Sequence, residues 1–435
     1  MTAEHAVDTP SSLVLSPFRG LRFTAAADRD AVMSPPYDMI DPARAQRLAS
    51  EDAHNIVRVI LPELNEPDPR LRYQRAARTL RDWRAEGLLA LDPEPALYVY
   101  EQADGEGPDS TVQRGLIGAL LLPSDESTSP IHPHEDVVDV VVRDRCSLMY
   151  ALGANPEPIL LTYQGGGPAS DLVERVAAED DPVLDVRTPD EVRHRLWAVT
   201  AAEDLEAAAT DLAEREALIA DGHHRYAAYG ELAKLGRAGS EHGLALLVDS
   251  VRHPLRVRGI HRWLPDLRVE PALREAEQWF TVEALDGGYR AALKALDGLP
   301  ADRIGFAVVD GHRSWLLSDP DEKLLAEYVP TDRPEAWRRL DATVLHHALA
   351  GGLWSIRDTP DHIRFDHDPR SAVAEAYRHS GIAVLLRPVA EATVIELAAA
   401  GYKMPRKSTS FSPKPATGLV LRLLDEEEGK REGKG

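Results

Sequence analysis

The sequence has a single cysteine, Cys146, among its 435 residues. One cysteine excludes an internal disulfide framework and is typical of a protein that works in a reducing cytoplasm. The first ten residues contain neither a basic stretch nor an apolar one, and the chain has no run of about 18 uncharged apolar residues. We therefore expect a cytoplasmic protein that neither is secreted nor spans a membrane.

Positive charge is scarce as well. The chain has 50 Lys and Arg against 72 Asp and Glu, which gives a formal net charge of −22. Binding of a nucleic-acid backbone needs a clustered basic surface that displaces counterions. We therefore expect small-molecule ligands and no nucleic acid, while the oligomeric state stays open. The sequence also lacks a Walker A motif and a kinase glycine-rich loop, so nothing in it demands an adenine pocket.

The length allows two or three hydrophobic cores, since 43% of the residues are hydrophobic. Apolar runs alternate with segments of helical spacing throughout, which predicts an α+β (mixed α/β) fold. The spacing predicts a strand over 56–61, ended by Pro62, and a helix over about 222–235, closed by Gly236. Charged and glycine-rich residues at 425–435 predict a disordered tail.

The most distinctive motif is Asp221-Gly222-His223-His224-Arg225, which follows a short apolar run. A strand end followed by glycine and a helix start presents backbone N–H groups at the positive end of the helix, which favours a bound phosphate. Arg225 adds a guanidinium fork, and Asp221 can hold a divalent cation. His223 and His224 titrate near neutral pH. We predict that residues 222–225 bind phosphate, that Asp221 is a catalytic residue and a Mg²⁺ ligand, and that both histidines take part in catalysis.

A simpler interpretation of the same motif remains open. Asp221 can be the N-cap of the predicted helix, with one histidine in the core and the other in solvent.

A second candidate group is Pro133-His134-Glu135, followed by Asp144 and Arg145. A glutamate beside histidines can act as a general base when burial or a neighbouring carboxylate raises its pKa. Phosphoryl transfer needs such a base and positive charge around the transferring group. We predict Glu135 as the base, His134 as a substrate ligand and Arg145 as a phosphate ligand. The alternative is a surface loop with solvated acids.

A third candidate group is Pro35-Pro36-Tyr37-Asp38 with Asn55 and Arg58. Asp38 suits a positively charged group of a substrate, and Arg58 suits a carboxylate. We predict that Tyr37, Asp38, Asn55 and Arg58 bind the substrate. The competing interpretation makes Tyr37 a core aromatic and Asp38 a helix N-cap, although Asp41 is better placed as that cap.

The loop at 403–414 brings together cations and hydroxyls in an otherwise acidic chain, which is typical of an anion site. We predict Lys407 as a further phosphate ligand; the alternative is a solvated loop. By contrast, His346 and His347 are adjacent in a predicted amphipathic helix near 336–349 and cannot grip one metal together. We expect one of them to be packed and the other exposed.

Taken together, these motifs resemble the domain-of-unknown-function family 1015, which is related to the ParB/sulfiredoxin superfamily and its free-serine kinases. The resemblance runs from about Leu15 to about Leu423. The stretches that carry it, besides 221–225, are 16–22, 34–40, 55–58, 133–135, 144–145, 404–409, 413–414 and 417–418. Arg406 and Ser410 stand where the family pattern has a proline and an aromatic residue.

The resemblance implies a ParB/sulfiredoxin-like catalytic region at 15–268 and a smaller C-terminal α/β region at 269–424, between tails at 1–14 and 425–435. It also implies transfer of a phosphoryl group from ATP, ADP or pyrophosphate to L-serine. Sulfiredoxin-like thiol chemistry is not expected, because histidine stands where a reactive cysteine is required.

Two other functions stay open at this stage. In the first, the protein is a metal-dependent hydrolase. Its candidate ligands are His132, His134, Asp221, His223 and His224. In the second, it is a non-catalytic regulatory protein that binds a nucleotide.

Overall fold

A computed structural model describes residues 12–105, 111–125, 128–359 and 361–425. By its internal contacts the chain divides into two compact units. Unit 1 contains residues 1–132, 137–255 and 413–435, and unit 2 contains residues 133–136 and 256–412. Both are mixed α/β, which confirms the predicted fold class. The predicted tail at 425–435 lies outside the described residues except for Asp425.

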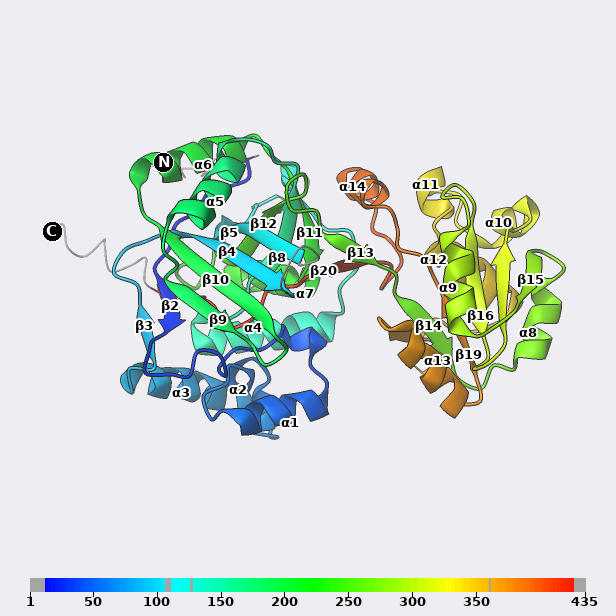
Figure 1. Ribbon diagram of the computed structural model, residues 1–435, viewed down its shortest axis with the longest axis horizontal. Helices are drawn as coiled ribbons and strands as arrows, with labels where there is room; N and C mark the ends of the chain where they lie inside the picture. Colours follow the sequence, from blue (N-terminus) through cyan, green and yellow to red (C-terminus); the bar gives the residue numbers. More distant parts are fainter. Residues whose placement is uncertain (1–11, 106–110, 126–127, 360, 426–435) are drawn as a thin grey trace, which may run out of the picture. The chain divides into compact units, whose positions relative to one another are not determined.

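Unit 1 is built on a mixed sheet of nine strands within the described residues (Figure 1). The order is β6 (Ile131–His132), β11 (Ala217–Asp221), β8 (Ile159–Tyr163), β12 (His242–Asp249), β5 (Thr111–Leu121), β4 (Leu97–Asp104), β10 (Val192–Val199) and β9 (Leu184–Arg187), with β1 (Leu15–Ser16) on β5. β11 runs parallel to β6 and antiparallel to β8. All five residues of β11 are buried, and the strand ends at Asp221, the first residue of the motif at 221–225.

The helices of unit 1 pack on this sheet and on one another. They are α1 (Pro42–Glu51), α2 (Val57–Ile60), α3 (Arg72–Ala85), α4 (Asp139–Leu152), α5 (Pro168–Glu179), α6 (Ala202–Ala213) and α7 (His223–Lys234). α4 packs against both α7 and α3. A smaller sheet orders β3 (Leu89–Leu91), β2 (Gly20–Phe23), β21 (Leu421–Leu423) and β7 (Ala154–Asn155). Through β21, the last part of the described chain belongs to unit 1.

The predicted strand over 56–61 is wrong, because residues Val57–Ile60 form the short helix α2. Asn55 explains the difference. Its side-chain oxygen accepts a hydrogen bond from the N–H of Val57 at 3.0 Å, and its amide donates to the carbonyls of Ala31 and Met33. A short apolar run does not distinguish a strand from a buried helical turn, and here the tertiary contacts of Asn55 decide. The helix predicted over about 222–235 is confirmed as α7.

Unit 2 contains an antiparallel sheet ordered β15 (Thr281–Leu285), β17 (Ser314–Ser318), β16 (Gly305–Val309), β19 (Ile382–Leu385), β14 (His261–Leu264) and β18 (Arg364–Asp366). A separate ribbon pairs β13 (Arg256–Arg258) with β20 (Ser410–Ser412). Its helical segments are α8 (Val269–Ala276), α9 (Tyr289–Asp297), α10 (Glu322–Tyr328), α11 (Glu335–Arg338), α12 (Asp341–Val344), the π-helix η4 (Leu345–Leu353), α13 (Pro369–Arg378) and α14 (Glu391–Ala399).

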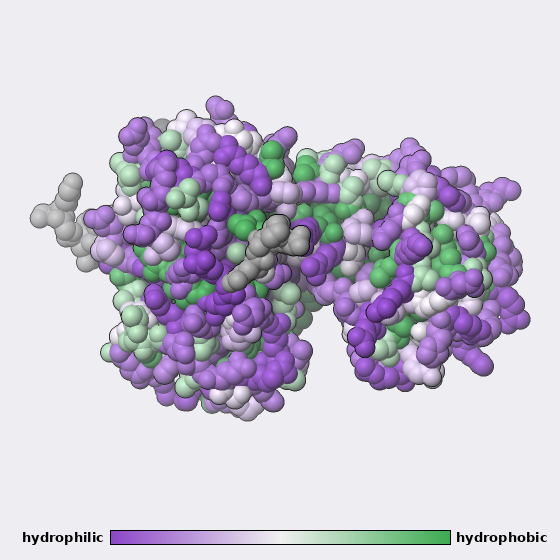
Figure 2. Space-filling model, viewed as in Figure 1, coloured by the Kyte–Doolittle hydropathy of each residue, from purple (hydrophilic) through white to green (hydrophobic). Residues whose placement is uncertain are grey.

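The surface agrees with the composition. In the view of Figure 2, hydrophilic residues cover most of what is visible and hydrophobic ones occur in small groups. Across the described ranges, the structure has no helix that is both long enough and apolar enough to cross a membrane.

Candidate active site

The site begins at the turn between β11 and α7, where Gly222 has a left-handed backbone with φ of +91°. A Cβ atom at this position would lie 2.9 Å from Cγ2 of Ile159 and 3.2 Å from Nε of Arg225. Glycine is therefore required both by the backbone conformation and by the space. β11 ends at Asp221 and α7 begins at His223, so the positive end of the helix lies next to the carboxyl end of the strand.

A chain of alternating charges surrounds this turn. Arg225 donates to Oδ2 of Asp221 at 2.7 Å, and the ammonium of Lys414 contacts the other oxygen of the same carboxylate. Lys414 also binds Oδ2 of Asp38 at 3.0 Å. Asp221 and Arg225 are 8% and 3% exposed, so these charges interact in a largely water-free environment. Lys414 thus joins two carboxylates that are far apart in the sequence.

These contacts correct two of the structural alternatives. The N-cap residue of α7 is Gly222, and the carboxylate of Asp221 binds cations instead of capping the helix. The N-cap of α1 is Asp41, which accepts from the N–H of Arg44 at 2.8 Å, so Asp38 is available to Lys414. His223 is buried, and the ring of His224 accepts from the backbone N–H of Val138 at 3.0 Å through Nε2.

Glu157 also belongs to this cluster, although it was not among the residues predicted for the site. Its side chain is buried, and Oε1 accepts from the backbone N–H of Tyr37 at 3.0 Å and from the hydroxyl of Thr417 at 3.2 Å. Burial raises the pKa of this carboxyl. The one signal for it in the sequence is an acid placed between Pro156 and Pro158 at the start of an apolar strand.

Arg145 extends the cluster toward a cavity on the other side of Tyr37. Its guanidinium carbon lies 4.3 Å from the centre of the Tyr37 ring, and that of Arg225 lies 6.0 Å away. Arg145 also donates to Asp144 at 2.8 Å. Although burial raises the pKa of Asp144, Arg145 and Tyr73 together hold it below its usual value.

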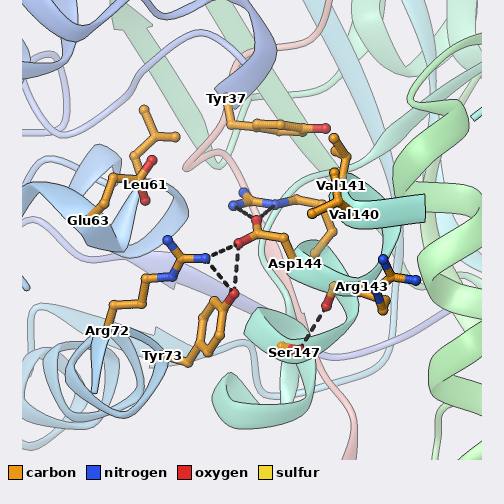
Figure 3. A pocket seen from close by; sticks show the side chains of 11 residues that line it. Tyr37, Leu61, Glu63, Arg72, Tyr73, Val140, Val141, Arg143, Asp144 and Ser147 are labelled. Atoms are coloured by element: carbon orange, nitrogen blue, oxygen red, sulfur yellow. Dashed lines mark hydrogen bonds and ion pairs between the residues drawn. The ribbon is translucent and has the colours of Figure 1, made fainter. Parts of the chain in front are cut away.

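The cavity has a volume of about 490 Å³. Figure 3 shows Arg72 and Tyr73 converging on Asp144 inside it, at 2.6 Å and 2.7 Å, with Tyr37 at its opposite side. Leu61 and Val141 supply apolar wall. The cavity lining therefore combines two carboxylates, three guanidiniums and two phenol groups: Glu63 and Asp144, Arg72, Arg143 and Arg145, and Tyr37 and Tyr73.

Two predicted substrate ligands bind parts of the scaffold instead of lining the cavity. Asn55 holds the backbone at Ala31 and Met33, as described above. Arg58 donates to Oδ1 of Asn65 at 2.7 Å and to the carbonyl of Ala49. A direct role for Asn55 and Arg58 in binding stays a prediction.

Three further predicted residues belong to unit 2. His134 shares a hydrogen bond of 2.8 Å between its Nε2 and the hydroxyl of Thr409, and Glu135 forms a β-bridge with Met404. Lys407 lies in the same loop, with a positive φ of 59°. The structure thus brings the His134-Glu135 segment together with residues 404–409, while the predicted loop at 403–414 is divided between the units, since Lys414 belongs to unit 1.

The described residues do not fit a resident Mg²⁺ ion. Among them no group of three or more His, Cys, Asp or Glu side chains could hold a metal. Asp221 is already bound by Arg225 and Lys414, so the position that a cation would take between Asp221 and Asp38 is filled by an ammonium. The same finding leaves the metal-dependent hydrolase without a ligand set in the described ranges.

The chain belongs to the family of proteins of unknown function called DUF1015, whose family model matches residues 15–343. This match confirms the resemblance seen in the sequence. No curated protein matches the chain.

Several solved structures are similar to it. A free serine kinase in complex with AMP has 17% identity and a TM-score of 0.34, with 69% of this chain and 90% of that chain covered. A conserved hypothetical protein from Pyrococcus furiosus has 17% identity and a TM-score of 0.35, with 68% and 93% covered. SbnI from Staphylococcus aureus has 12% identity and a TM-score of 0.34, with 70% and 91% covered. The function of the present chain is argued from its own residues.

The turn at Gly222 gives the first prediction. We expect Gly222→Ala to destabilise unit 1 by about 2 kcal/mol, because alanine must adopt a left-handed backbone against Ile159. Gly230→Ala is the matched control within α7. It has open space around the new methyl group, so we expect it to stabilise the helix by about 0.5–1 kcal/mol. Urea unfolding followed by circular dichroism measures both, and equal effects would contradict the account.

Lys414 gives the second prediction. Although burial lowers the pKa of Lys414, Asp221 and Asp38 raise it further, so the folded value lies above the unfolded one. Its stabilisation is therefore complete below the unfolded pKa of about 10.4 and is lost as the pH rises through the folded pKa. We expect Lys414→Gln to cost about 3 kcal/mol at pH 8, since it removes the buried ammonium that lies between the carboxylates of Asp221 and Asp38.

The difference between wild type and Lys414→Gln is expected to shrink as the pH rises above the unfolded pKa of about 10.4 and through the higher folded pKa of Lys414. Urea unfolding at several pH values provides the measurement. Lys234→Gln is the control, because Lys234 is exposed and its ion pair with Glu231 lies on the helix surface. A Lys414→Gln difference that is below about 1 kcal/mol at pH 8 would show that the bridge is no more than a surface ion pair.

Proposed function

We propose that this protein is a phosphotransferase that moves a phosphoryl group from ATP, ADP or pyrophosphate to the hydroxyl of a free amino acid, most directly L-serine, giving O-phosphoserine. The observation that carries the proposal is Arg225. Its guanidinium is buried at the first turn of α7, beside the positive helix end, and its Nε has no hydrogen-bond partner among the described residues. Buried N–H groups of this kind are strong ligands for phosphate oxygens.

The charges of the cluster support binding by exchange of partners. Cations and carboxylates alternate and balance one another: Arg72, Arg145, Arg225 and Lys414 against Asp38, Asp144, Glu157 and Asp221. A donor phosphate competes with Asp221 for Arg225 and Lys414, which are then freed to stabilise the charge of the transferring group. Asp221 in turn controls where these two cations point. Mg²⁺ enters this proposal only as an ion carried by the donor phosphates in solution.

The cavity beside Tyr37 supports an amino-acid acceptor in unit 1. Asp144 offers a carboxylate for the acceptor ammonium, and Arg72 offers a guanidinium for its carboxylate. We assign carboxylate recognition to Arg72 in place of Arg58, because Arg72 lines the cavity whereas Arg58 is bound by Asn65 and Ala49. Tyr37 lines the cavity, and its ring centre lies 6.0 Å from the guanidinium carbon of Arg225.

In the transfer itself, the acceptor oxygen forms a bond to phosphorus while the bond from phosphorus to the leaving oxygen of the donor breaks. The hydroxyl proton goes to a general base. Glu135 is the predicted base, His134 a predicted acceptor ligand and Lys407 a predicted phosphate ligand. All three belong to unit 2, and these roles stay predictions from the sequence. His223 and His224, in the first turn of α7, are proposed to bind the donor phosphates and to take part in catalysis.

Phosphorus NMR of the purified full-length chain tests this proposal. Mg²⁺ and L-serine are supplied with ATP, ADP or pyrophosphate in separate tubes, and we expect an O-phosphoserine resonance in at least one. We expect Asp221→Asn and Glu135→Gln each to lower the rate by about 10²-fold or more. Glu231→Gln is the matched control, since Glu231 is exposed on α7 and forms a surface ion pair with Lys234.

Other outcomes overturn the proposal in distinct ways. Donor hydrolysis that L-serine does not divert to phosphoserine would exclude serine as the acceptor. Nucleotide binding without any turnover, unchanged in Glu135→Gln, would favour the non-catalytic regulatory protein.

A further inference from the structure

Unit 2 contains a second cavity, of about 530 Å³, which lies wholly within that unit. Its walls come from α11, from the π-helix η4 and the segment that follows it, and from the loop after α14. The charged and aromatic side chains that line it are Asp136, Arg333, Trp337, His346, His347, Asp358, Lys403 and Arg406. A cavity of this size holds a small organic molecule.

Arg262, on β14, lies directly behind this lining and is 1% exposed. Its Nε donates to Nε2 of His346 at 3.1 Å, and its Nη2 donates to the carbonyl of Arg406 at 3.3 Å. Within the described ranges no carboxylate lies at ion-pair distance from this guanidinium. Burial lowers the pKa of Arg262 to about 9. A buried guanidinium without an ion pair is costly, so a nearby negative charge would stabilise it.

His346 orients Arg262 without supplying that negative charge. Its Nε2 accepts the hydrogen bond from Nε–H of Arg262, so this nitrogen carries no proton and the ring is neutral. The proton is on Nδ1, which donates to Asp358 at 3.0 Å. Burial lowers the pKa of His346 as well, which keeps the ring neutral. Arg406 contacts the other oxygen of Asp358 at 3.4 Å. One carboxylate, Asp358, therefore serves both His346 and Arg406.

The lining of the cavity has more positive than negative charge, since Arg333, Lys403 and Arg406 face Asp136 and Asp358. Lys403 is paired with Asp136 at 3.2 Å, and Arg406 is paired with Asp358. Arg333 lies over the ring of Trp337, at 5.7 Å, and contacts Asp332, outside the lining, at 3.9 Å. This local excess of one positive charge occurs in a chain with a net charge of −22.

We propose that this cavity is a binding site for a small phosphate monoester, held by Arg406 and Arg333 with its organic part against Trp337. A phosphate monoester carries a charge of about −1.5 to −2 at neutral pH, opposite in sign to the excess of positive charge. Guanidiniums match its oxygens in geometry. The site belongs to unit 2 alone and does not depend on the proposed transfer reaction.

Fluorine NMR of the full-length chain labelled with 5-fluorotryptophan tests this site directly. The Trp337 resonance is assigned from its loss in Trp337→Phe. Titration with phenyl phosphate is expected to shift this resonance saturably. Benzoate, which has the same ring but one negative charge, is expected to bind at least about tenfold more weakly, because one charge-assisted contact is lost.

Variants distinguish this cavity from the site in unit 1. Arg406→Gln is expected to weaken phenyl phosphate at least about tenfold. Arg333→Gln is expected to do the same, and it gives a second test if Arg406→Gln fails to fold, since Arg333 is exposed. Arg290→Gln, an exposed arginine of α9, and Asp221→Asn in unit 1 are expected to leave the Trp337 shift unchanged.

Three results would overturn the proposal. They are no saturable shift of Trp337, equal affinity for benzoate, or loss of the shift in Asp221→Asn. Failure of the phosphotransferase assay would leave these outcomes unaffected, so the two proposals fail independently.

Discussion

The candidate site of unit 1 depends on the ammonium of Lys414, which lies between Asp38 and Asp221. This single group joins the segments around residues 38, 221 and 414, which are far apart in the sequence, near the start of α7. Because Lys414 is largely buried, it compensates two carboxylates that would otherwise repel each other in a medium of low dielectric constant. Arg225 completes the arrangement from within α7. The proposed phosphate site is therefore held by tertiary ion pairs as much as by the local turn.

The local part of this site could be predicted from the sequence because it is encoded in consecutive residues. A strand end, a glycine and a helix start specify the turn at Gly222, and Asp221 and Arg225 were both expected at this site. The basic loop was also expected to bind an anion, but nothing in its sequence indicated that Lys414 belongs to unit 1 while Lys407 belongs to unit 2. Such a division depends on tertiary contacts.

Other features carried no pattern that a sequence can reveal. Glu157 is one acid between two prolines, and its importance comes from Tyr37 and Thr417, which reach it from distant segments. The run at 56–61 was assigned to a strand because its apolar residues fit one, whereas the hydrogen bonds of Asn55 select a helix. One of His346 and His347 was expected to be packed. The buried one is His346, and its partners Arg262 and Asp358 come from β14 and the segment after η4.

The most direct test of the central claim is a crystal structure of the protein with bound pyrophosphate. We expect phosphate oxygens within hydrogen-bond distance of the backbone N–H groups at the start of α7 and of the Arg225 guanidinium. We also expect the contact between Lys414 and Asp221 to be lengthened or broken. Pyrophosphate bound elsewhere, with Asp221 still held by Arg225 and Lys414, would contradict the claim that this ion-pair cluster is a phosphate site.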